Sequence, residues 1–129
     1  MRRGTQLSVT LENKPGQAAK LAAALARAKV NIEAISVVDA ADVGVVRLVT
    51  SSNAKAKAAL RRAGMNVVQQ PVVIARLPNE PGALAAAAKK LAAAGVNISY
   101  LYGSAARAGE PSTVVMGVSD VAQAVKALG

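Results

Sequence analysis

The chain has 129 residues, a formal net charge of +9 and 53% hydrophobic residues, with neither cysteine nor histidine. The lack of both residue types excludes disulfides, thiolate catalysis, imidazole bases and nearly every zinc or iron site, so we expect neither a metal nor a cofactor. No stretch reaches the roughly 18 apolar residues of a membrane span, and the amino-terminal MRRGTQLSV lacks a signal-peptide core, which predicts a cytoplasmic protein.

The first half of the chain begins with a strand pattern and then a helix pattern. Residues 5–11, TQLSVTL, alternate with period two, which predicts a half-buried strand. After Pro15 and Gly16, apolar residues recur at helical spacing from residue 17 to residue 29 and predict an amphipathic helix.

Two strands, a helix and a last strand follow. VNIEAISVVDA and VVRLVTS are rich in β-branched residues and predict two strands, with a hairpin turn at Asp42 and Gly44 between them. Ser52 or Asn53 is suited to cap a short helix over residues 54–63, and NVVQQ predicts a closing strand. The order of elements is therefore βαββαβ.

The second half repeats the first. LENKPG at residues 11–16 returns as LPNEPG at residues 77–82, and AKVNI at residues 28–32 returns as AGVNI at residues 94–98. Between and after these motifs we expect strand VVIARL, a helix over residues 82–94, strands NISYLYGS and TVVMGVS joined by the loop AARAGEP, and a helix capped by Asp120. The segment MNVVQQPVVIARL is compatible with two strands or with one long strand bent at Pro71 and shared between the units.

We therefore predict an α+β fold of two ferredoxin-like βαββαβ units, residues 1–70 and 71–129, the second without its last strand. Each antiparallel sheet carries its helices on one face, because both crossovers must be right-handed. Units of roughly 65 residues are near the lower limit for an independent core. The small units and their bare sheet faces favour a homo-oligomer, most simply a dimer.

The repeated Asn-x-Pro-Gly corner is the first candidate site. It joins a strand to the start of a helix, where free N–H groups and the helix dipole favour an anion such as a carboxylate. Asn13 and Asn79 add an amide that both donates and accepts. The alternative is structural: each Asn caps a helix, and Asn31 and Asn97 are left-handed residues that end one.

Both halves resemble the ACT domain, the small ligand-binding module of amino-acid metabolism, in the Asn-x-Pro-Gly corner, the small-residue helix, the VNI segment and the element order. In that family the corner Asn and the VNI Asn contact an amino acid across a domain interface. The resemblance implies that Asn13 faces Asn97 and that Asn79 faces Asn31. It implies a ligand site made of the two corners, the two VNI segments and a tyrosine: Asn13, Lys14, Pro15, Gly16, Asn31, Ile32, Asn79, Glu80, Pro81, Gly82, Asn97, Ile98 and Tyr100. Tyr100 is alternatively core or interface filler.

The function that follows is a non-catalytic sensor of a free amino acid that controls assembly or a partner enzyme of amino-acid metabolism. No catalytic motif appears, and Asp39 and Asp42 lie where a hairpin turn needs them. One alternative is a structural oligomerisation module with vestigial pockets. Another, weaker one is a basic nucleic-acid-binding protein, because the expected central strands carry no aromatic residue on which bases would stack.

Overall fold

The computed structural model describes residues 1–104 and 107–129, so Ala105 and Ala106 of the expected loop AARAGEP lie outside the described residues. The described residues form six antiparallel strands and four helices, which confirms the predicted α+β fold. None of these helices is long and apolar enough to cross a membrane. In chain order the elements are β1 (Arg2–Glu12), α1 (Gln17–Arg27), β2 (Ile32–Ala40), β3 (Val43–Thr50), α2 (Asn53–Arg62), β4 (Asn66–Pro78), α3 (Ala83–Ala93), β5 (Ile98–Gly103), β6 (Pro111–Val118) and α4 (Val121–Leu128).

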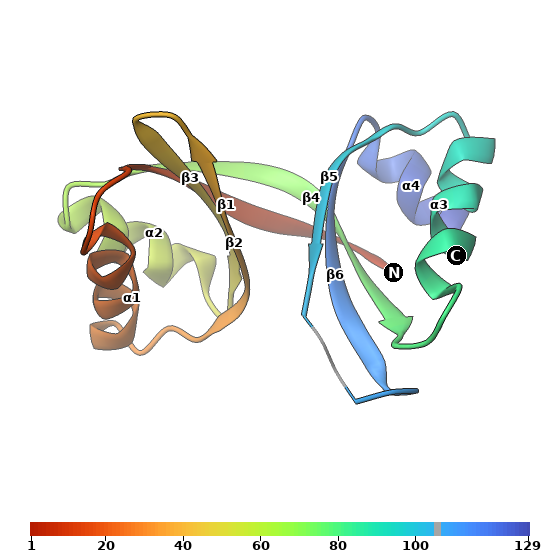
Figure 1. The fold of residues 1–129 in the computed structure, drawn as a ribbon, viewed down its shortest axis with the longest axis horizontal. Coiled ribbons are helices and arrows are strands. Elements are labelled where there is room, and N and C mark those ends of the chain that lie inside the picture. The colour runs from red at the N-terminus through yellow and green to blue at the C-terminus, as the bar shows by residue number, and fades with distance from the viewer. Residues whose placement is uncertain (105–106) are drawn as a thin grey trace. The chain divides into compact units, whose positions relative to one another are not determined.

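The chain forms two compact units (Figure 1). The first unit is Thr5–Gln70, in which the strand order is β2-β3-β1-β4. Its register places Leu7 opposite Leu48 and Leu11 opposite Gly44. This is the strand order of a ferredoxin-like βαββαβ unit, with α1 and α2 on one face of the sheet (Figure 1).

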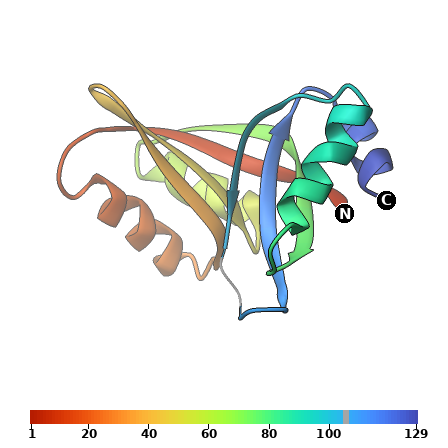
Figure 2. The same cartoon turned by 45° about the vertical axis from the view of Figure 1, so that its right-hand side comes forward.

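The second unit combines Pro71–Gly129 with Met1–Gly4. Its strand order is β1-β4-β6-β5, and α3 and α4 lie side by side on one face (Figure 2). The start of β1 stands beside β4, where the fourth strand of a βαββαβ unit belongs. Gly4 is in contact with Ile74, and a Cβ on Gly4 would overlap the Ile74 side chain. A segment from the other end of the chain therefore takes the place of the strand that the sequence pattern lacks.

Two strands thus run through both units. β4 continues through Pro71 as one strand of 13 residues, so the single-strand alternative for MNVVQQPVVIARL is confirmed. β1 begins at Arg2, three residues before the predicted alternation. Period-two patterning marks only the half-buried part of a strand, which explains why the exposed start of β1 was not predicted.

Each unit has its own hydrophobic core. In the first, Leu7 and Val9 of β1 meet Leu21 and Leu25 of α1 and Leu60 of α2. In the second, the core comprises Val73, Ala75 and Leu77 of β4, Met116 of β6, Ala87 and Leu91 of α3, Val96, and Ala124 and Leu128 of α4. Helices rich in alanine approach the sheets closely, and the few leucines supply most of the buried area.

The β2–β3 hairpin turn lies earlier than the sequence predicts. Ala41, with φ of 61°, and Asp42 form the turn, while Gly44 pairs with Leu11 and Asp39 inside the sheet. The prediction that Gly44 is a turn residue is therefore wrong. Strand pairing on both sides of β3 outweighs the local turn preference of glycine, because Gly44 is the buried partner of two strands.

Helix α4 begins at a side-chain cap, as predicted. The carboxylate oxygen Oδ1 of Asp120 accepts a hydrogen bond of 3.0 Å from the backbone N–H of Gln123. Ser52 caps α2 in the same manner, accepting from the Lys55 N–H at 3.3 Å. We expect Asp120→Ala to lower the free energy of unfolding by about 0.5–2 kcal/mol in a urea titration, because the N–H groups at the helix start lose their acceptor.

An exposed substitution away from any cap, Lys89→Ala, is the control and should change the unfolding free energy by less than about 0.5 kcal/mol. Equal midpoints for Asp120→Ala and the unmodified protein would show that the cap does not stabilise α4.

Candidate functional site

The two Asn-x-Pro-Gly corners have the same backbone geometry. The N-cap residues of helices α1 and α3 are Gly16 and Gly82, whose φ angles are 90° and 88° and which make no side-chain cap bond. Only glycine takes this conformation without strain, which explains the residue type at both positions. The N-cap residues of these helices are therefore Gly16 and Gly82 rather than Asn13 and Asn79.

The first corner is joined to the β2–β3 turn. The Asn13 N–H donates to the Asp42 carbonyl at 3.0 Å. Its side-chain Nδ2 donates to Asp39 Oδ1 at 2.9 Å and to the Ala41 carbonyl at 3.1 Å. The donor half of the Asn13 amide thus holds the turn, and its Oδ1 is the atom with which it would contact a ligand.

Charge distinguishes the two corners. At the first, Lys14 Nζ pairs with Glu12 at 2.8 Å, and this hydrogen bond together with the lysine charge lowers the pKa of Glu12. Both side chains are more than half exposed, so the pair contributes little to stability. In the second corner the same positions hold Pro78 and Glu80, so a carboxylate replaces the lysine.

Asn31 and Asn97 directly precede β2 and β5 and make matching contacts. The Asn31 N–H donates to Ser51 Oγ at 2.9 Å, and the Ser51 N–H returns a bond to the Asn31 carbonyl. Asn97 and Ser119 repeat this exchange, with Asn97 N–H to Ser119 Oγ at 3.0 Å. The left-handed residue after each helix is Lys29 or Gly95, so the helix-ending alternative for the two asparagines is wrong.

Within each unit the two asparagines lie at opposite ends of the sheet. The corner Asn forms a backbone hydrogen bond with the residue just before the third strand of its unit. The VNI Asn forms one with the residue just after that strand. That strand, β3 or β6, has eight residues, or about 26 Å at 3.3 Å per residue. Residues of one unit therefore cannot bring both asparagines to one small ligand. The predicted facing of Asn13 with Asn97, and of Asn79 with Asn31, stays a prediction.

The second corner opens onto a pocket of about 280 Å³. The corner forms one wall, α3 the second, and the strands β5 and β6 the third. Residues Leu77, Pro78, Asn79, Glu80, Ala83, Leu84, Leu101, Gly103, Ser112 and Val114 line it.

Ser112 gives this pocket its chemical character. Its Oγ is buried and has no hydrogen-bond partner among the described residues. A buried hydroxyl without a partner is destabilising, so such an atom in a pocket indicates a place for a ligand atom. The N–H groups of Leu84 and Ala85, in the first turn of α3, have no acceptor inside the helix. Hydroxyl and helix terminus together suit a carboxylate.

The register shows that the first unit differs at this place. Leu11 pairs with Gly44 whereas Leu77 pairs with Ser112, so the first unit has no hydroxyl there. Val37 pairs with Val46 whereas Gly103 pairs with Val114, so a valine side chain in the first unit occupies the space that Gly103 leaves open. The two corners are therefore chemically unequal.

Sequence reasoning missed Leu101, Gly103 and Ser112. Gly103 lies 66 residues after Val37, the offset of the repeat, so a residue-by-residue comparison of the two halves would have detected it. Ser112 follows a hairpin of different length, and only strand register aligns it with Gly44.

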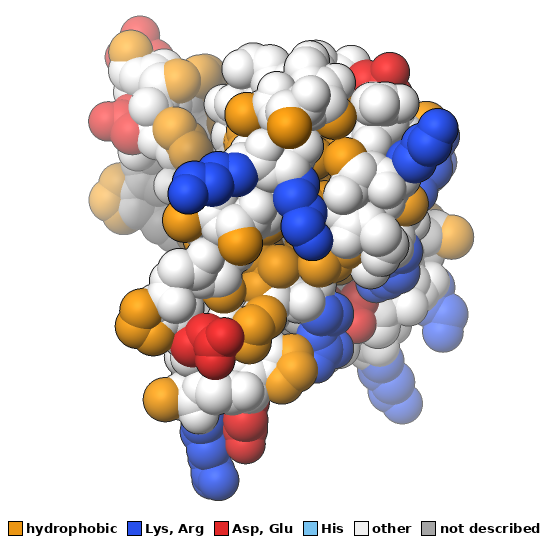
Figure 3. All heavy atoms as spheres, turned by 90° about the vertical axis from the view of Figure 1, so that its right-hand side faces the viewer, with side chains coloured by type: hydrophobic (Ala, Val, Ile, Leu, Met, Phe, Trp, Pro, Cys, Tyr) orange, Lys and Arg blue, Asp and Glu red, His pale blue; other side chains and the backbone are white. Residues whose placement is uncertain are grey.

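A second hollow, of about 420 Å³, lies on the helix side of the same corner. Its lining includes Met1, Pro81, Ala86, Lys90 and Leu128. Figure 3 views the molecule from this side and shows apolar side chains exposed between lysine and arginine side chains. The hollow is thus largely apolar, and the charged residues Lys90 and Glu80 also line it.

Tyr100 has a structural contact. It pairs across β5 and β6 with Gly117, and a Cβ on Gly117 would overlap the tyrosine ring. The ring therefore lies directly over the glycine, a cross-strand arrangement that compensates for the missing glycine side chain.

A family profile described as ACT domain pair matches residues 3–125. The chain belongs to the ACT domain pair family. The predicted resemblance is thus confirmed. Protein BT0572 of Bacteroides thetaiotaomicron has 34% sequence identity with this ACT pair and a TM-score of 0.91, with 98% of this chain and 86% of that one covered.

Regulatory subunits of aspartate kinase share the fold. The subunit from Thermus thermophilus has 18% identity and a TM-score of 0.68 over 99% of this chain and 93% of that one. The subunit from Thermus flavus has 18% identity and a TM-score of 0.64 over 98% and 93%. No curated protein matches the ACT pair in sequence.

Proposed function

We propose that this ACT pair is a non-catalytic regulatory protein that binds a free amino acid at the second corner. The observation that carries the proposal is the buried, unpartnered Ser112 hydroxyl in the pocket beside Asn79. A volume of about 280 Å³ is just below the roughly 300–1,000 Å³ of sites for drug-sized ligands, so it suits a smaller molecule.

The lining provides for each part of an amino acid. Ser112 Oγ and the N–H groups at the start of α3 would bind the carboxylate. Glu80 at the rim offers a carboxylate to the ammonium group. Leu77, Leu101 and Val114 provide an apolar wall for the side chain of the ligand. Asn79 adds the amide that the family uses for the same purpose.

The regulatory part of the proposal is supported by fold. Structures with a similar fold are regulatory subunits of aspartate kinase. We propose by analogy that ligand binding biases the association of this ACT pair with itself, as a homodimer, and with a partner enzyme of amino-acid metabolism. The asparagines Asn13, Asn31 and Asn97 would contribute where a second ACT unit is in contact.

The test is thermal unfolding of the protein in each of the twenty amino acids at several millimolar. A ligand at 100 times its Kd adds about 2.7 kcal/mol to the unfolding free energy, which we expect to raise Tm by about 5–10 °C for one amino acid or a related few. In Ser112→Ala the ligand-induced rise in Tm should be largely lost. The Tm without ligand should be unchanged or higher, because the Ser112 hydroxyl has no hydrogen bond to lose among the described residues. An equal rise in Ser112→Ala would refute the site.

A structural assembly module is the second candidate, favoured by one observation. Ile35, Val37 and Val38 are 47%, 59% and 44% exposed on β2, an edge strand of its unit. Exposed apolar edge strands are surfaces for strand pairing. No Tm rise with any amino acid, together with a dimer in sedimentation analysis that ignores ligands, would favour this candidate over the sensor.

A further inference from the structure

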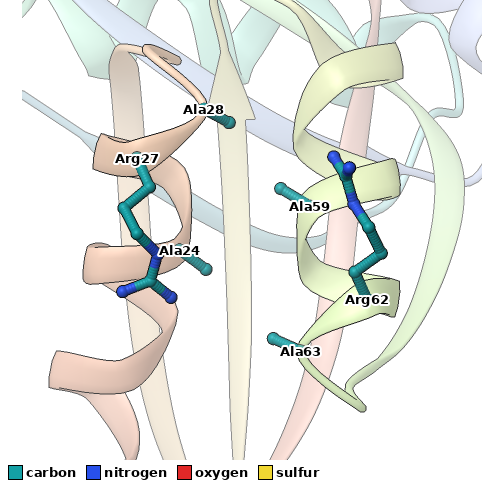
Figure 4. Close-up of a pocket in the computed structure, with 6 residues that line it drawn as sticks. All are labelled: Ala24, Arg27, Ala28, Ala59, Arg62 and Ala63. Atoms are coloured by element: carbon teal, nitrogen blue, oxygen red, sulfur yellow. The ribbon is translucent and has the colours of Figure 1, made fainter.

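A crevice between α1 and α2 of the first unit is not explained by the amino-acid site. It has a volume of about 330 Å³ and is lined by six residues, Ala24, Arg27, Ala28, Ala59, Arg62 and Ala63. Figure 4 shows the alanine methyl groups of the two helices pointing toward one another, with an arginine on each helix beside the gap. The crevice thus combines an apolar floor with two cationic margins.

The two arginines have no evident role in stabilising the fold. Both are exposed, and among the described residues neither pairs with an Asp or Glu side chain. By contrast, Lys57 donates to Gln69 Oε1 at 3.0 Å, and Arg61 donates to the Val67 carbonyl at 3.3 Å. Lys57 and Arg61 are thus bonded within the unit, whereas Arg27 and Arg62 remain available to another molecule.

The whole helix layer has one sign of charge. Residues 17–29 and 53–64 contain seven of the sixteen basic residues and none of the seven acidic ones. The seven are Lys20, Arg27, Lys29, Lys55, Lys57, Arg61 and Arg62. Like charges on one face repel each other and weaken the fold, so such a surface is complementary to an acidic partner.

The second unit does not repeat the alanine and arginine pattern of the crevice. At the offset of 66 residues, Lys90 stands in place of Ala24 and Ala93 in place of Arg27. The residues that build the fold recur in both halves, whereas the arginine on the first helix does not. The ACT fold therefore does not require it.

We propose that the α1–α2 crevice is a docking site for an acidic helical segment of a partner protein. Small side chains let a third helix approach closely, and a slot of alanine methyl groups accepts an aliphatic side chain from it. Carboxylates on the same segment pair with Arg27 and Arg62, whose guanidinium groups bind carboxylates in bidentate geometry.

An acidic protein segment fits this surface better than a nucleic acid does. Single strands bind by stacking their bases on aromatic side chains. The only aromatic residues of the chain are Tyr100 and Tyr102, which belong to the other unit. The positive charge is also spread over seven residues, a larger surface than a single small anion in the crevice would contact. This proposal is independent of the amino-acid site.

The test uses fluorescein-labelled peptides and fluorescence anisotropy with the full chain. The probe is a helical 20-residue peptide with leucine along one face and glutamate on the flanks. One control peptide keeps the glutamates and replaces leucine with asparagine; a 20-nucleotide single-stranded DNA is the other control. We expect the probe to bind more tightly than either control, and more weakly as salt rises.

Matched variants locate the contact. Arg27→Gln with Arg62→Gln should weaken the probe about 10-fold, since exposed charge pairs each contribute modestly. Lys89→Gln with Lys90→Gln removes the same charge from α3 and should change binding less than twofold. Ala28→Leu keeps every charge and should weaken the probe by filling the crevice.

Three results would overturn the proposal. They are unchanged binding in the arginine double variant, equal weakening by the α3 double variant, or binding of the asparagine peptide or the DNA as tight as that of the probe. The last would show a nonspecific polyanion surface. Circular dichroism of each variant establishes that the fold is intact, and because all four substituted cations are exposed, their removal should leave Tm nearly unchanged.

Discussion

Leu91→Ala is expected to lower the free energy of unfolding by about 2–5 kcal/mol. Leu91 is fully buried at the centre of the second core, and truncation there removes apolar contacts and leaves a cavity that close-packed neighbours cannot fill. A urea titration followed by circular dichroism measures the change. Leu84→Ala makes the same chemical change at a site that is 44% exposed, and should lower the unfolding free energy far less.

The same experiment tests how the two cores are coupled. Because β1 and β4 each contribute to both units, we expect Leu25→Ala in the first core and Leu91→Ala in the second to shift one common transition. Two separate transitions in either variant would contradict this and would show that the shared strands do not unite the cores.

Gly103→Val is expected to remove most of the stabilisation by the amino acid that the unmodified protein binds. The valine side chain would enter the 280 Å³ pocket from β5, at the position that Val37 holds in the first unit. A Cβ at Gly103 would lie 3.4 Å from the Thr113 carbonyl oxygen and from Val114 Cγ2, tight but without overlap. The backbone should therefore accept the change, and the ligand should bind at least 10-fold more weakly.

Isothermal titration with that amino acid measures the loss, and Val37→Gly in the first unit is the matched control. Val37→Gly should leave the affinity of the Ser112 pocket within about twofold. Undiminished binding by Gly103→Val would place the ligand elsewhere, while an unmodified protein that binds no amino acid would instead refute the sensor function.

Much of the fold followed from two sequence signals. Period-two alternation at Leu7, Val9 and Leu11, and helical spacing at Leu21 and Leu25, both reflect burial on one face, and burial is what the structure shows. The Asp120 cap was also predictable, because a cap needs only residues close to it in sequence.

What the sequence did not predict depends on contacts between distant residues. Glycine is common in turns, but the strand pairing on both sides of Gly44 moves the turn to Ala41 and Asp42. The amide of Asn13 bonds across 26 residues to Asp39. The position of Ser112 in the pocket likewise depends on a distant residue, because it follows from the pairing of Ser112 with Leu77 of β4.

The shared strands have a consequence for the order in which the protein is built. On a ribosome the residues Met1–Gly4 emerge before Pro71–Gly129, with which they form one unit. The first unit has its complete set of strands once Gln70 has appeared, whereas Met1–Gly4 must wait for Pro71–Gly129. The start of β1 therefore stays without its strand partner until Pro71–Gly129 has emerged, and during that time chaperones and proteases have access to it.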